Sequence, residues 1–594
     1  MTQEQLQSFY TTRRSAFSES LSSITKKINL ISNIRLATAI AFLIVIYFSF
    51  TEHNLLYLAA LLLAIFVILV RRHSILFDEK THLENLVALN DAESKAATGD
   101  YAPLSTGVEY IDPHHPYSHD LDIFGEGSLF QYINRCNTLG GKRKFADRLL
   151  APLPSGESIY EQQQAIQELS ALTDFRQHFQ AAGKEMDEQR DDRAQLQAWL
   201  AQPAFLYGRP VYKYLLAIFP VVTIALIILA FFLPAIKGYA ILSALAQWAI
   251  LGFHIKKINA FHDYINRKKN ILQKFARLLH YLQHNAFKAP LLKRLSEHAH
   301  EADAKVKSLA SLVSSLDARL NAMTTLVVNS LLLYDLQCVY RLEKWKANHA
   351  EKLLAWLNTV DEMEVLGSFG TFAFNHPNFQ YAAIHEKLAI EIDQLSHPLI
   401  RENERIANDL MLGNKQSVLI VTGANMAGKS TFLRTIGVNL VLALSGAPVC
   451  AQSLRCPIIY LRTGMRTADS LKDHQSYFYA ELNRLKTIMD ELRNDKPLLI
   501  LLDEILKGTN STDKQAGSIA LVKQLLPHPC LAMVATHDLA LGELQTEYPD
   551  RVKNYCFEAT IENDQLSFDY KLKPGLAQKM NATFLMKKMG IIPA

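Results

Sequence analysis

Two long apolar stretches dominate the pattern of hydrophobic and polar positions along the chain. Between Leu36 and Val70 the only formal charge is Glu52, and between Tyr214 and Phe253 it is Lys237. Because a helix needs about 20 apolar residues to cross a bilayer core, each stretch fits two passes joined by a tight turn. We therefore predict two transmembrane helical hairpins, at 34–72 and 211–254. The alternative interpretation is a pair of buried core helices.

Basic residues flank both predicted hairpins, whereas the turns are nearly uncharged. The flanking residues are Lys26, Lys27, Arg35, Arg71 and Arg72 for the first hairpin, and Arg209, Lys213, Lys256 and Lys257 for the second. By the positive-inside rule, both termini and the middle segment are expected in the cytoplasm. The predicted location is the inner (cytoplasmic) membrane, with a multi-pass topology. No cleavable signal peptide is expected, since about 35 mixed residues precede the first apolar run.

The C-terminal third contains three apolar runs that each predict a buried strand ending in a polar motif. "QSVLIVTG" ends on Gly423 and leads into the loop Gly423-Ala-Asn-Met-Ala-Gly428-Lys429-Ser430, which has the G-x4-GK[ST] spacing of a phosphate-binding loop. "KPLLILLDE" ends in Asp503 and Glu504, and "CLAMVATHD" contains His537. Three such motifs in this order predict an ATPase that uses ATP and Mg²⁺.

Each residue type in these motifs suits one task of phosphoryl transfer. Glycines let backbone N–H groups turn toward phosphates, and the helix that starts near Lys429 adds its positive dipole end. Lys429 is expected to reach the phosphates. Metal ligation is expected from the Ser430 hydroxyl and Asp503. We predict that Glu504 orients the attacking water and that His537 senses the γ-phosphate.

Charge and cysteine content add little by themselves. The net charge is +4 on 62 basic and 58 acidic residues, and the six cysteines are scattered without a CxxC pair. This pattern favours a reducing compartment and no zinc site. Locally, residues 254–294 carry ten basic residues against Asp263 alone. That basic run is a candidate surface for DNA phosphates or for anionic lipid headgroups.

A heptad-like stripe follows the basic run. It consists of Val306, Leu309, Val313, Leu316, Leu320, Met323 and Val327, at alternating spacings of three and four. We interpret it as the face of a lever helix that packs against the outgoing lever helix. A separate coiled-coil partner is the alternative.

The residues around the nucleotide motifs resemble the MutS family of ABC-type ATPases. The similar segments are "TGANMAGKSTFLRTIGVNLVLA", "LLDEILKGTNSTDKQAG", "ATHDLAL", "DSLKDHQSYFYAEL" and the closing "YKLKPGLAQKMNATFLMKKMGIIP". Upstream, 127–153 is similar to the start of the family's helical core and 356–382 to its end. The chain departs from the family pattern at Ala424, where proline is usual.

The resemblance implies the remaining site residues. Nucleotide binding is expected from Gly423, Asn425, Gly428, Lys429, Ser430 and Thr431. Ser476 is expected to complete the site of the other subunit in a homodimer with shared ATP sites. Arg405 stands where the family has a phenylalanine that stacks on adenine, and its guanidinium is a candidate for that contact.

These observations predict an α/β ABC-type P-loop ATPase domain at the C-terminus, joined to an α-helical lever and core domain that carries two transmembrane helical hairpins. The expected layout is an N-terminal cytoplasmic helix (1–33), hairpin (34–72), cytoplasmic linker (73–117), first half of the helical core (118–210), hairpin (211–254), lever helix and second half of the core (255–390), and MutS-type ATPase domain in the cytoplasm (391–594).

A transporter is disfavoured, because no LSGGQ-like signature is present and four short passes are few for a substrate pathway. The leading hypothesis is a membrane-anchored MutS-family ATPase that binds and processes DNA in an ATP-dependent manner. Mismatch specificity is not expected, because nothing before residue 118 resembles the family's mismatch-reading domain. The alternative is a mechanical ATPase that moves membrane helices or a membrane partner and has no DNA role.

Overall fold

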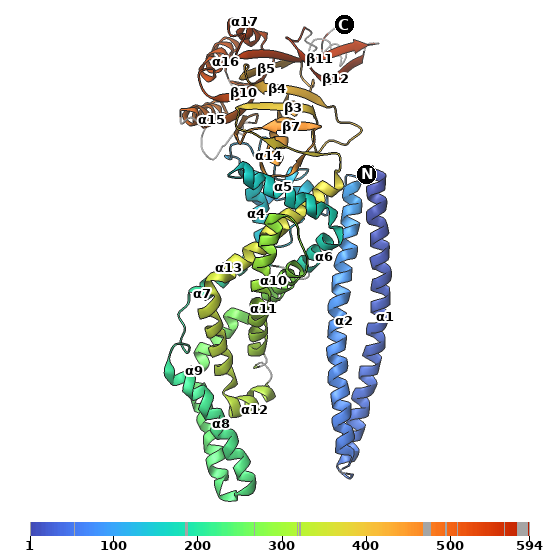
Figure 1. Ribbon diagram of the computed structural model, residues 1–594, viewed down its shortest axis with the longest axis vertical. Helices are drawn as coiled ribbons and strands as arrows, with labels where there is room; N and C mark the ends of the chain where they lie inside the picture. The colour runs from blue at the N-terminus through green and yellow to red at the C-terminus, as the bar shows by residue number, and fades with distance from the viewer. Residues whose placement is uncertain are drawn as a thin grey trace.

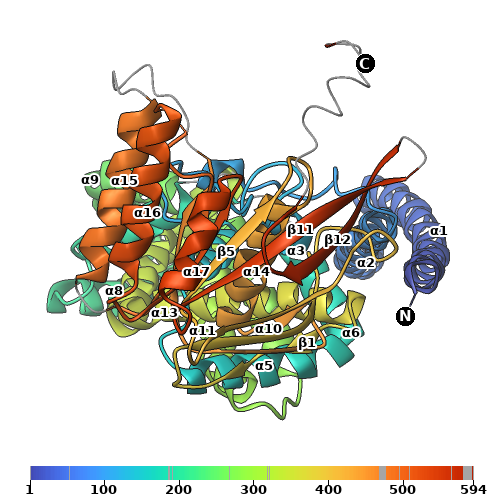
Figure 2. The same ribbon diagram turned by 90° about the horizontal axis from the view of Figure 1, so that it is seen from above.

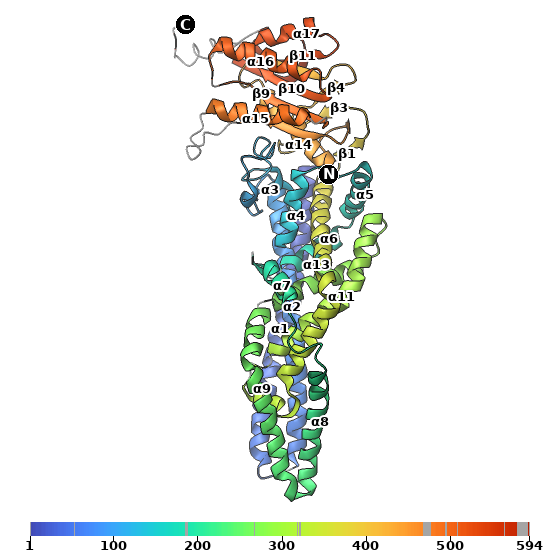
Figure 3. The same ribbon diagram turned by 90° about the vertical axis from the view of Figure 1, so that its left-hand side faces the viewer.

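The computed structural model describes residues 2–52, 54–184, 188–189, 191–266, 268–317, 319, 322–466, 477–493, 496–507, 509–562, 565–578 and 592. The α/β domain lies at one end of an elongated molecule, and two helical hairpins extend from the helical core toward the other end (Figure 1). The view at right angles also shows the α/β domain at one end, the helical core in the middle and the hairpins at the other end (Figure 3).

Hairpin 1 is formed by two helices that pack on each other, α1 (Gln3–Ser49) and α2 (Leu55–Ala97). Residues 73–97, which were expected in a linker, continue α2 instead. The N-terminal helix and the first apolar pass likewise form one uninterrupted helix. In the most apolar stretch of α1 no residue is buried, and in that of α2 almost none is.

Hairpin 2 is inserted within the helical core, between α7 (Asp192–Ala201) and α10 (Lys269–Gln283). It comprises α8 (Pro210–Phe232), the short helix η2 (Pro234–Ile236) and α9 (Lys237–Asn266). By length and composition the described residues contain four helices able to cross a membrane, two in each hairpin. Both hairpins point away from the α/β domain in both side views (Figures 1 and 3).

The rest of the helical core connects the hairpins to the α/β domain. Its elements are η1 (Val108–Tyr110), α3 (Leu129–Ile133), α4 (Leu139–Leu150), α5 (Gly156–Ala171), α6 (Thr173–Lys184), α11 (Pro290–Asp317), α12 (Ala322–Leu332) and α13 (Tyr334–Asn375). The 42 residues of α13 make a rod about 63 Å long that runs from hairpin 2 to the first strand of the α/β domain.

The predicted stripe is only partly one helix face. Val306, Leu309, Val313 and Leu316 are buried on α11, which packs against α10 and α13. These two helices, rather than an outgoing lever helix, are therefore its main neighbours. Val327 lies on the separate helix α12 and is 52% exposed.

The α/β domain is built on a six-stranded sheet with the order β12-β11-β5-β10-β9-β8. All neighbouring pairs are parallel except β11 with β12. Its strands are β5 (Val418–Gly423), β8 (Tyr460–Gly464), β9 (Leu498–Asp503), β10 (Cys530–Thr536), β11 (Val552–Glu562) and β12 (Gln565–Pro574). The apolar runs predicted as strands are β5, β9 and β10, whose continuous burial is typical of parallel strands covered on both faces.

Helices complete this domain (Figure 2), together with a smaller sheet whose strands β3, β4 and β7 are labelled in Figure 1. The helices are α14 (Lys429–Leu444), α15 (Tyr477–Leu492), α16 (Ser511–Leu525), η4 (Leu539–Glu543) and α17 (Leu544–Glu547). The second sheet has the order β2-β7-β3-β4, with β2 (Ala383–Ile384), β3 (Ala389–Leu395), β4 (Asn408–Gly413) and β7 (Ser453–Cys456). The strands β1 (Gln380–Tyr381) and β6 (Pro448–Val449) pair with each other.

One hydrophobic core is continuous from the helical core into the α/β domain. Polar contacts reinforce the junction at Asp120, which is fully buried. Its carboxylate accepts hydrogen bonds from the Thr463 hydroxyl at 2.6 Å, the Met465 N–H at 3.0 Å and the Arg484 guanidinium at 2.8 Å. Asp120 therefore connects the helical core to the end of β8.

Candidate nucleotide site

The sheet brings three polar motifs to one edge. Because β10 lies between β5 and β9 in parallel register, the three strands end at the same edge of the sheet, at Thr536, Gly423 and Asp503. The loop after β5, Glu504 after β9 and His537 after β10 consequently face the same crevice. In open parallel sheets this crevice outside the carboxyl ends of the strands is the usual place for a ligand.

Two glycines shape the loop after β5. Gly423 has φ 154°, and a Cβ there would lie 2.7 Å from the carbonyl oxygen of Phe557. Gly428 has φ 102°, and a Cβ there would lie 3.0 Å from the Tyr570 ring. Both positions therefore require glycine. The loop ends at the N-terminus of α14, whose free N–H groups and dipole favour an anion.

Lys429 lies beneath this loop and is 5% exposed. Its ammonium donates hydrogen bonds to the carbonyl oxygens of Gly423 at 2.8 Å and Ala424 at 3.0 Å. Burial lowers the pKa of Lys429, while the nearby carboxylates of Asp503 and Glu504 oppose that shift. The loop carbonyls thus orient one cation toward the anion site.

Glu504 is held by the residue at the end of the neighbouring strand. Its Oε1 lies 2.7 Å from Nε2 of His537, and its Oε2 lies 3.6 Å from the Lys507 ammonium. The hydrogen bond from His537 is the main reason that the pKa of Glu504 is lowered to about 2. The carboxylate is therefore ionised at neutral pH. Its backbone has φ 51°, a sparsely populated conformation for a non-glycine residue that is common at functional sites.

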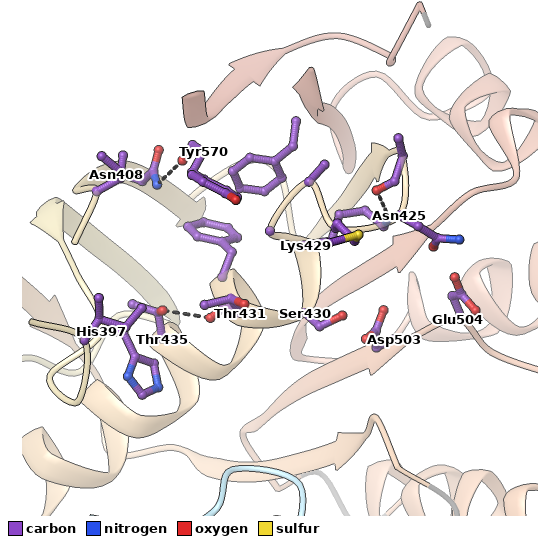
Figure 4. Close-up of a pocket in the computed structure, with 18 of the residues that line it drawn as sticks. His397, Asn408, Asn425, Lys429, Ser430, Thr431, Thr435, Asp503, Glu504 and Tyr570 are labelled. Carbon is purple, nitrogen blue, oxygen red and sulfur yellow. Dashed lines mark hydrogen bonds between the residues drawn. The ribbon is translucent and has the colours of Figure 1, made fainter. Parts of the chain in front are cut away.

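These residues line a cavity of about 600 Å³, a size typical of small-molecule sites (Figure 4). The predicted residues that line it are Asn425, Gly428, Lys429, Ser430, Thr431, Asp503, Glu504 and His537. Gly423 immediately precedes Ala424, which lines the cavity. Ser476 lies outside the described residues.

A nucleotide with Mg²⁺ fits this set of residues. Glycine at positions 423 and 428 avoids the collision that a side chain would make with Phe557 or Tyr570, and Lys429 supplies a buried positive charge. The hydroxyl of Ser430 and the carboxylate of Asp503 line the same part of the cavity, as Figure 4 shows. Oxygen donors of these two types are what Mg²⁺ prefers.

Arg405 does not line this cavity. Its Nε donates to the carbonyl oxygen of Ile400 at 3.1 Å, its Nη1 contacts Cys450 Sγ at 3.1 Å, and the guanidinium lies 5.5 Å from the centre of the Phe379 ring. It faces a second, smaller cavity beside hairpin 1. The structure therefore gives no support to Arg405 as the adenine contact, because its donors and its flat face are engaged elsewhere.

Other residues close the end of the cavity away from Glu504. His397, Asn408, Phe557 and Tyr570 line it, and Asn408 Nδ2 donates to the carbonyl oxygen of Tyr570 at 3.0 Å. None of these four residues follows from the sequence pattern. Tyr570 lies within the closing family segment, but no spacing rule distinguishes it there from the tyrosines and phenylalanines nearby.

The predicted basic run does not form one free surface. Lys268 pairs with Asp192 at 2.6 Å, Lys269 with Asp317 at 2.9 Å, Arg277 with Asp78 at 3.3 Å and Arg294 with Glu161 at 2.6 Å. Lys274 is 2% exposed. Lys256, Lys257, Lys288 and Lys293 are exposed. Half of the run is therefore paired with acidic residues or buried, which reduces the positive charge that it offers to a phosphate or lipid.

The fold and cavity define an ABC-type P-loop ATPase domain, and comparisons with known proteins agree. The family model of MutS domain III matches residues 117–495, and that of MutS domain V, the ATPase domain, matches residues 419–593. Since the first match covers more than half of the chain, the chain belongs to the MutS family.

Several curated relatives are similar to this chain over part of its length. DNA mismatch repair protein MutS of Thermotoga sp. (strain RQ2) is 30% identical over 249 residues, which is 41% of this chain and 30% of the relative. The protein of the same name from Halalkalibacterium halodurans is 29% identical over 252 residues (41% and 28%), and that from Chloroflexus aurantiacus 30% over 255 residues (41% and 26%). The match thus spans less than a third of the length of these relatives.

Proposed function

We propose that the protein is a membrane-anchored MutS-family ATPase that hydrolyses ATP with Mg²⁺ and acts on DNA without mismatch specificity. The observation that carries the ATPase part is the meeting of Lys429, Glu504 and His537 at one sheet edge, around a cavity large enough for the nucleotide. The names of the relatives support DNA as the substrate.

The chain's own residues divide the work of hydrolysis. Ser430 and Asp503 would hold Mg²⁺, which would supply positive charge next to the phosphates. Lys429 and the N-terminus of α14 stabilise the phosphate oxygens. Glu504, ionised and oriented by His537, positions a water molecule for attack on the γ-phosphate and accepts its proton, while the bond between the γ-phosphorus and the bridging oxygen breaks and ADP leaves. We propose that two chains share their sites in a homodimer, with Ser476 reaching the partner's nucleotide.

Alanine at Lys429 tests the nucleotide site. Lys429→Ala should abolish ATP binding, because it removes the buried cation beneath the loop. Lys415→Ala, an exposed lysine in the turn after β4, is the matched control and should bind ATP normally. ATP affinity at the wild-type level in Lys429→Ala would refute the assignment.

Membrane anchoring is supported by the exposed apolar surfaces of both hairpins, which point to the same end of the molecule. Exposed apolar surface of this extent is stable in lipid and unfavourable in water. Single cysteines at the turns, Asn54→Cys and Gly238→Cys, should react with an impermeant thiol reagent from outside intact cells. A cysteine at Ser74 should not. The six native cysteines are all buried and are replaced in the background chain.

A second function is favoured by the internal pairing of the basic run, which leaves fewer cations for DNA. It is a mechanical ATPase that moves membrane helices or a membrane partner. Binding of homoduplex, single-mismatch and branched DNA to the protein in nanodiscs, at two salt concentrations, separates the two functions. DNA binding that weakens steeply with salt and differs less than tenfold between homoduplex and mismatch supports the first. Binding to anionic lipid with no binding to any DNA supports the second.

A further inference from the structure

The segment that joins α11 to the rod α13 is unusually apolar. From Leu320 to Tyr334 it contains no formal charge, while Arg319 and Asp335 flank it. Within it, α12 has 11 residues, which gives a length of about 17 Å. A helix of this length is too short to cross the roughly 30 Å of a bilayer core.

Contacts with hairpin 2 fix the depth of α12. It packs against α8, α9 and α13. At its C-terminal end, the indole N–H of Trp248 donates to Ser330 Oγ at 2.8 Å, and the N–H of Leu333 donates to Gln247 Oε1 at 3.1 Å. Gln247 lies ten residues after Lys237 at the turn and nine before Lys256, or about 15 and 14 Å along the helix. The end of α12 therefore meets hairpin 2 halfway along its apolar stretch.

The outer face of α12 is apolar and exposed. Leu326 is 56% exposed and Val327 52%, whereas Asn329 on the inner side is 1% exposed. On α9, Leu245 is 59% exposed at nearly the same depth as Gln247. The exposed surface of α12 thus continues that of hairpin 2, beside which α12 lies in Figure 1.

The irregular backbone between α12 and α13 is fully enclosed. Leu333 has φ 48° and no exposed surface, and the Asn329 side chain accepts a hydrogen bond from the Asp335 N–H at 3.0 Å. Arg319 pairs with Asp335 at 3.1 Å and donates to Asn259 on α9 at 2.6 Å. Non-helical backbone is tolerated at membrane depth only where protein groups satisfy and cover it, and the backbone N–H groups of Leu333 and Asp335 have such partners in Gln247 and Asn329.

We propose that α12 is a re-entrant membrane helix, packed on hairpin 2, whose Leu326 and Val327 contact the acyl chains of the cytoplasmic leaflet. The proposal rests on the membrane anchoring put forward above. Lipid is the occupant that fits, because the exposed face is uncharged and continuous with the exposed face of hairpin 2. Through Leu333, α12 also joins the membrane directly to the rod α13.

Depth-dependent fluorescence quenching tests this placement. Leu326→Cys and Val327→Cys, each in a chain without native cysteines, are labelled with an environment-sensitive fluorophore and placed in nanodiscs. The quenchers are phospholipids brominated on the acyl chain and aqueous iodide. Leu245→Cys is the control for hairpin 2, and Leu354→Cys on α13, which is 36% exposed and about 31 Å along the helix from Leu333, is the control for water. ATP turnover of each labelled chain verifies that it is folded.

We expect brominated lipid to quench the labels at 326 and 327 within about twofold of the label at 245, and iodide to quench only the label at 354. Quenching at 326 and 327 by iodide, with lipid quenching retained at 245, would refute the re-entrant helix and leave the anchoring intact. Protection at both positions from both quenchers would also refute it, because a second protein copy would then cover α12. Loss of lipid quenching at 245 would instead refute the anchoring itself.

Discussion

The two hairpins look alike in sequence but join the protein in different ways. Hairpin 1 precedes the helical core in the chain and packs against it. Its contacts with the core lie in the polar half of the hairpin. Tyr10 donates to Asn375 at 2.7 Å, and the buried carboxylate of Glu93 pairs with Arg135. Hairpin 2 is inserted within the helical core, and its Leu251 and Ile258 belong to the main hydrophobic core.

Their positions along α13 suggest different roles. Hairpin 1 docks near Asn375, at the end of α13 next to the ATPase domain. Hairpin 2 lies at the opposite end, where α13 begins after Leu333. A tilt of α13 about its ATPase end displaces the far end most. We infer that hairpin 1 serves mainly as an anchor and that hairpin 2 receives the motion produced by the nucleotide.

The largest effect is expected from Glu504→Gln, which removes the group that orients water but keeps Asp503. ATP turnover should fall about 10²–10⁴-fold while ATP still binds, and the exposed Glu386→Gln serves as control. In this trapped state, spin labels at Asn54 and Gly238 should change their separation when ATP is added. Labels at Asn54 and Ser74, both within hairpin 1, should not. An unchanged separation between the two hairpin tips would contradict the proposed transmission.

The next largest effect concerns the attachment of hairpin 1. Glu93→Gln leaves Arg135 buried without its charge partner, and breaking such a pair typically costs about 3–5 kcal/mol. Hydrogen exchange in the polar N-terminal half of α1 should therefore become much faster, while ATP turnover stays within about twofold. Glu109→Gln, at an exposed glutamate, should change neither. A large loss of turnover in Glu93→Gln would mean that hairpin 1 is more than an anchor.

The sequence predicted best the features that depend on neighbouring residues. The strand ends, the phosphate-binding loop and the start of α14 at Lys429 follow from local hydrophobicity and glycine spacing. The apolar hairpins were also predictable from neighbouring residues, because each contains long stretches without charge. Family resemblance located the ATPase segments, but it could not show that Arg405 turns away from the cavity toward Phe379 and Cys450.

Features that depend on distant residues were not predictable. The acids that pair with the basic run come from other elements, so a count within 254–294 missed Asp78, Glu161 and Asp192. The stripe from Val306 to Val327 reads as one helix because its spacing continues past the end of α11. The turn at Leu333 depends on Gln247, 86 residues earlier, and no local pattern indicates it.

A smaller effect is expected at the junction of hairpin 2 with α13. Gln247→Ala removes the side-chain acceptor of the buried Leu333 N–H, which keeps only its bond to the carbonyl oxygen of Asn329 at 3.3 Å. Loss of one such hydrogen bond costs about 0.5–1.5 kcal/mol. Hydrogen exchange at residues 329–336 should accelerate, and the ATP-dependent change between the hairpin tips should shrink. Thr38→Ala in hairpin 1 removes only a bond to the carbonyl oxygen of Ile34 in its own helix and should have neither effect. Equal effects of both substitutions would remove the distinction between the hairpins.

The smallest effect is a pH dependence confined to hairpin 1. Nδ1 of His178 on α6 lies 2.9 Å from Nε2 of His82 on α2, and the His178 ring packs against the Phe17 ring on α1. Burial is the main cause that lowers the pKa of His178 below the usual 6.5, and the charge of His82 lowers it further. Asp174 opposes this shift and Arg13 adds to it. Since the docked state favours neutral His178, the undocked state binds more protons as the pH falls below about 6.5.

Docking of hairpin 1 should therefore be complete near neutral pH and weaken on acidification, by at most tenfold per pH unit for one proton. Energy transfer between labels at Glu19 on α1 and Lys184 on α6, both exposed, should decrease reversibly between pH 7.5 and pH 5.5. His178→Gln, which stays neutral, should flatten this change, and a label pair at Leu245 and Leu326 should show little of it. If His178→Gln keeps the full pH dependence, the histidine pair is not its source, and hairpin 1 and hairpin 2 differ only in their mechanical connection to α13.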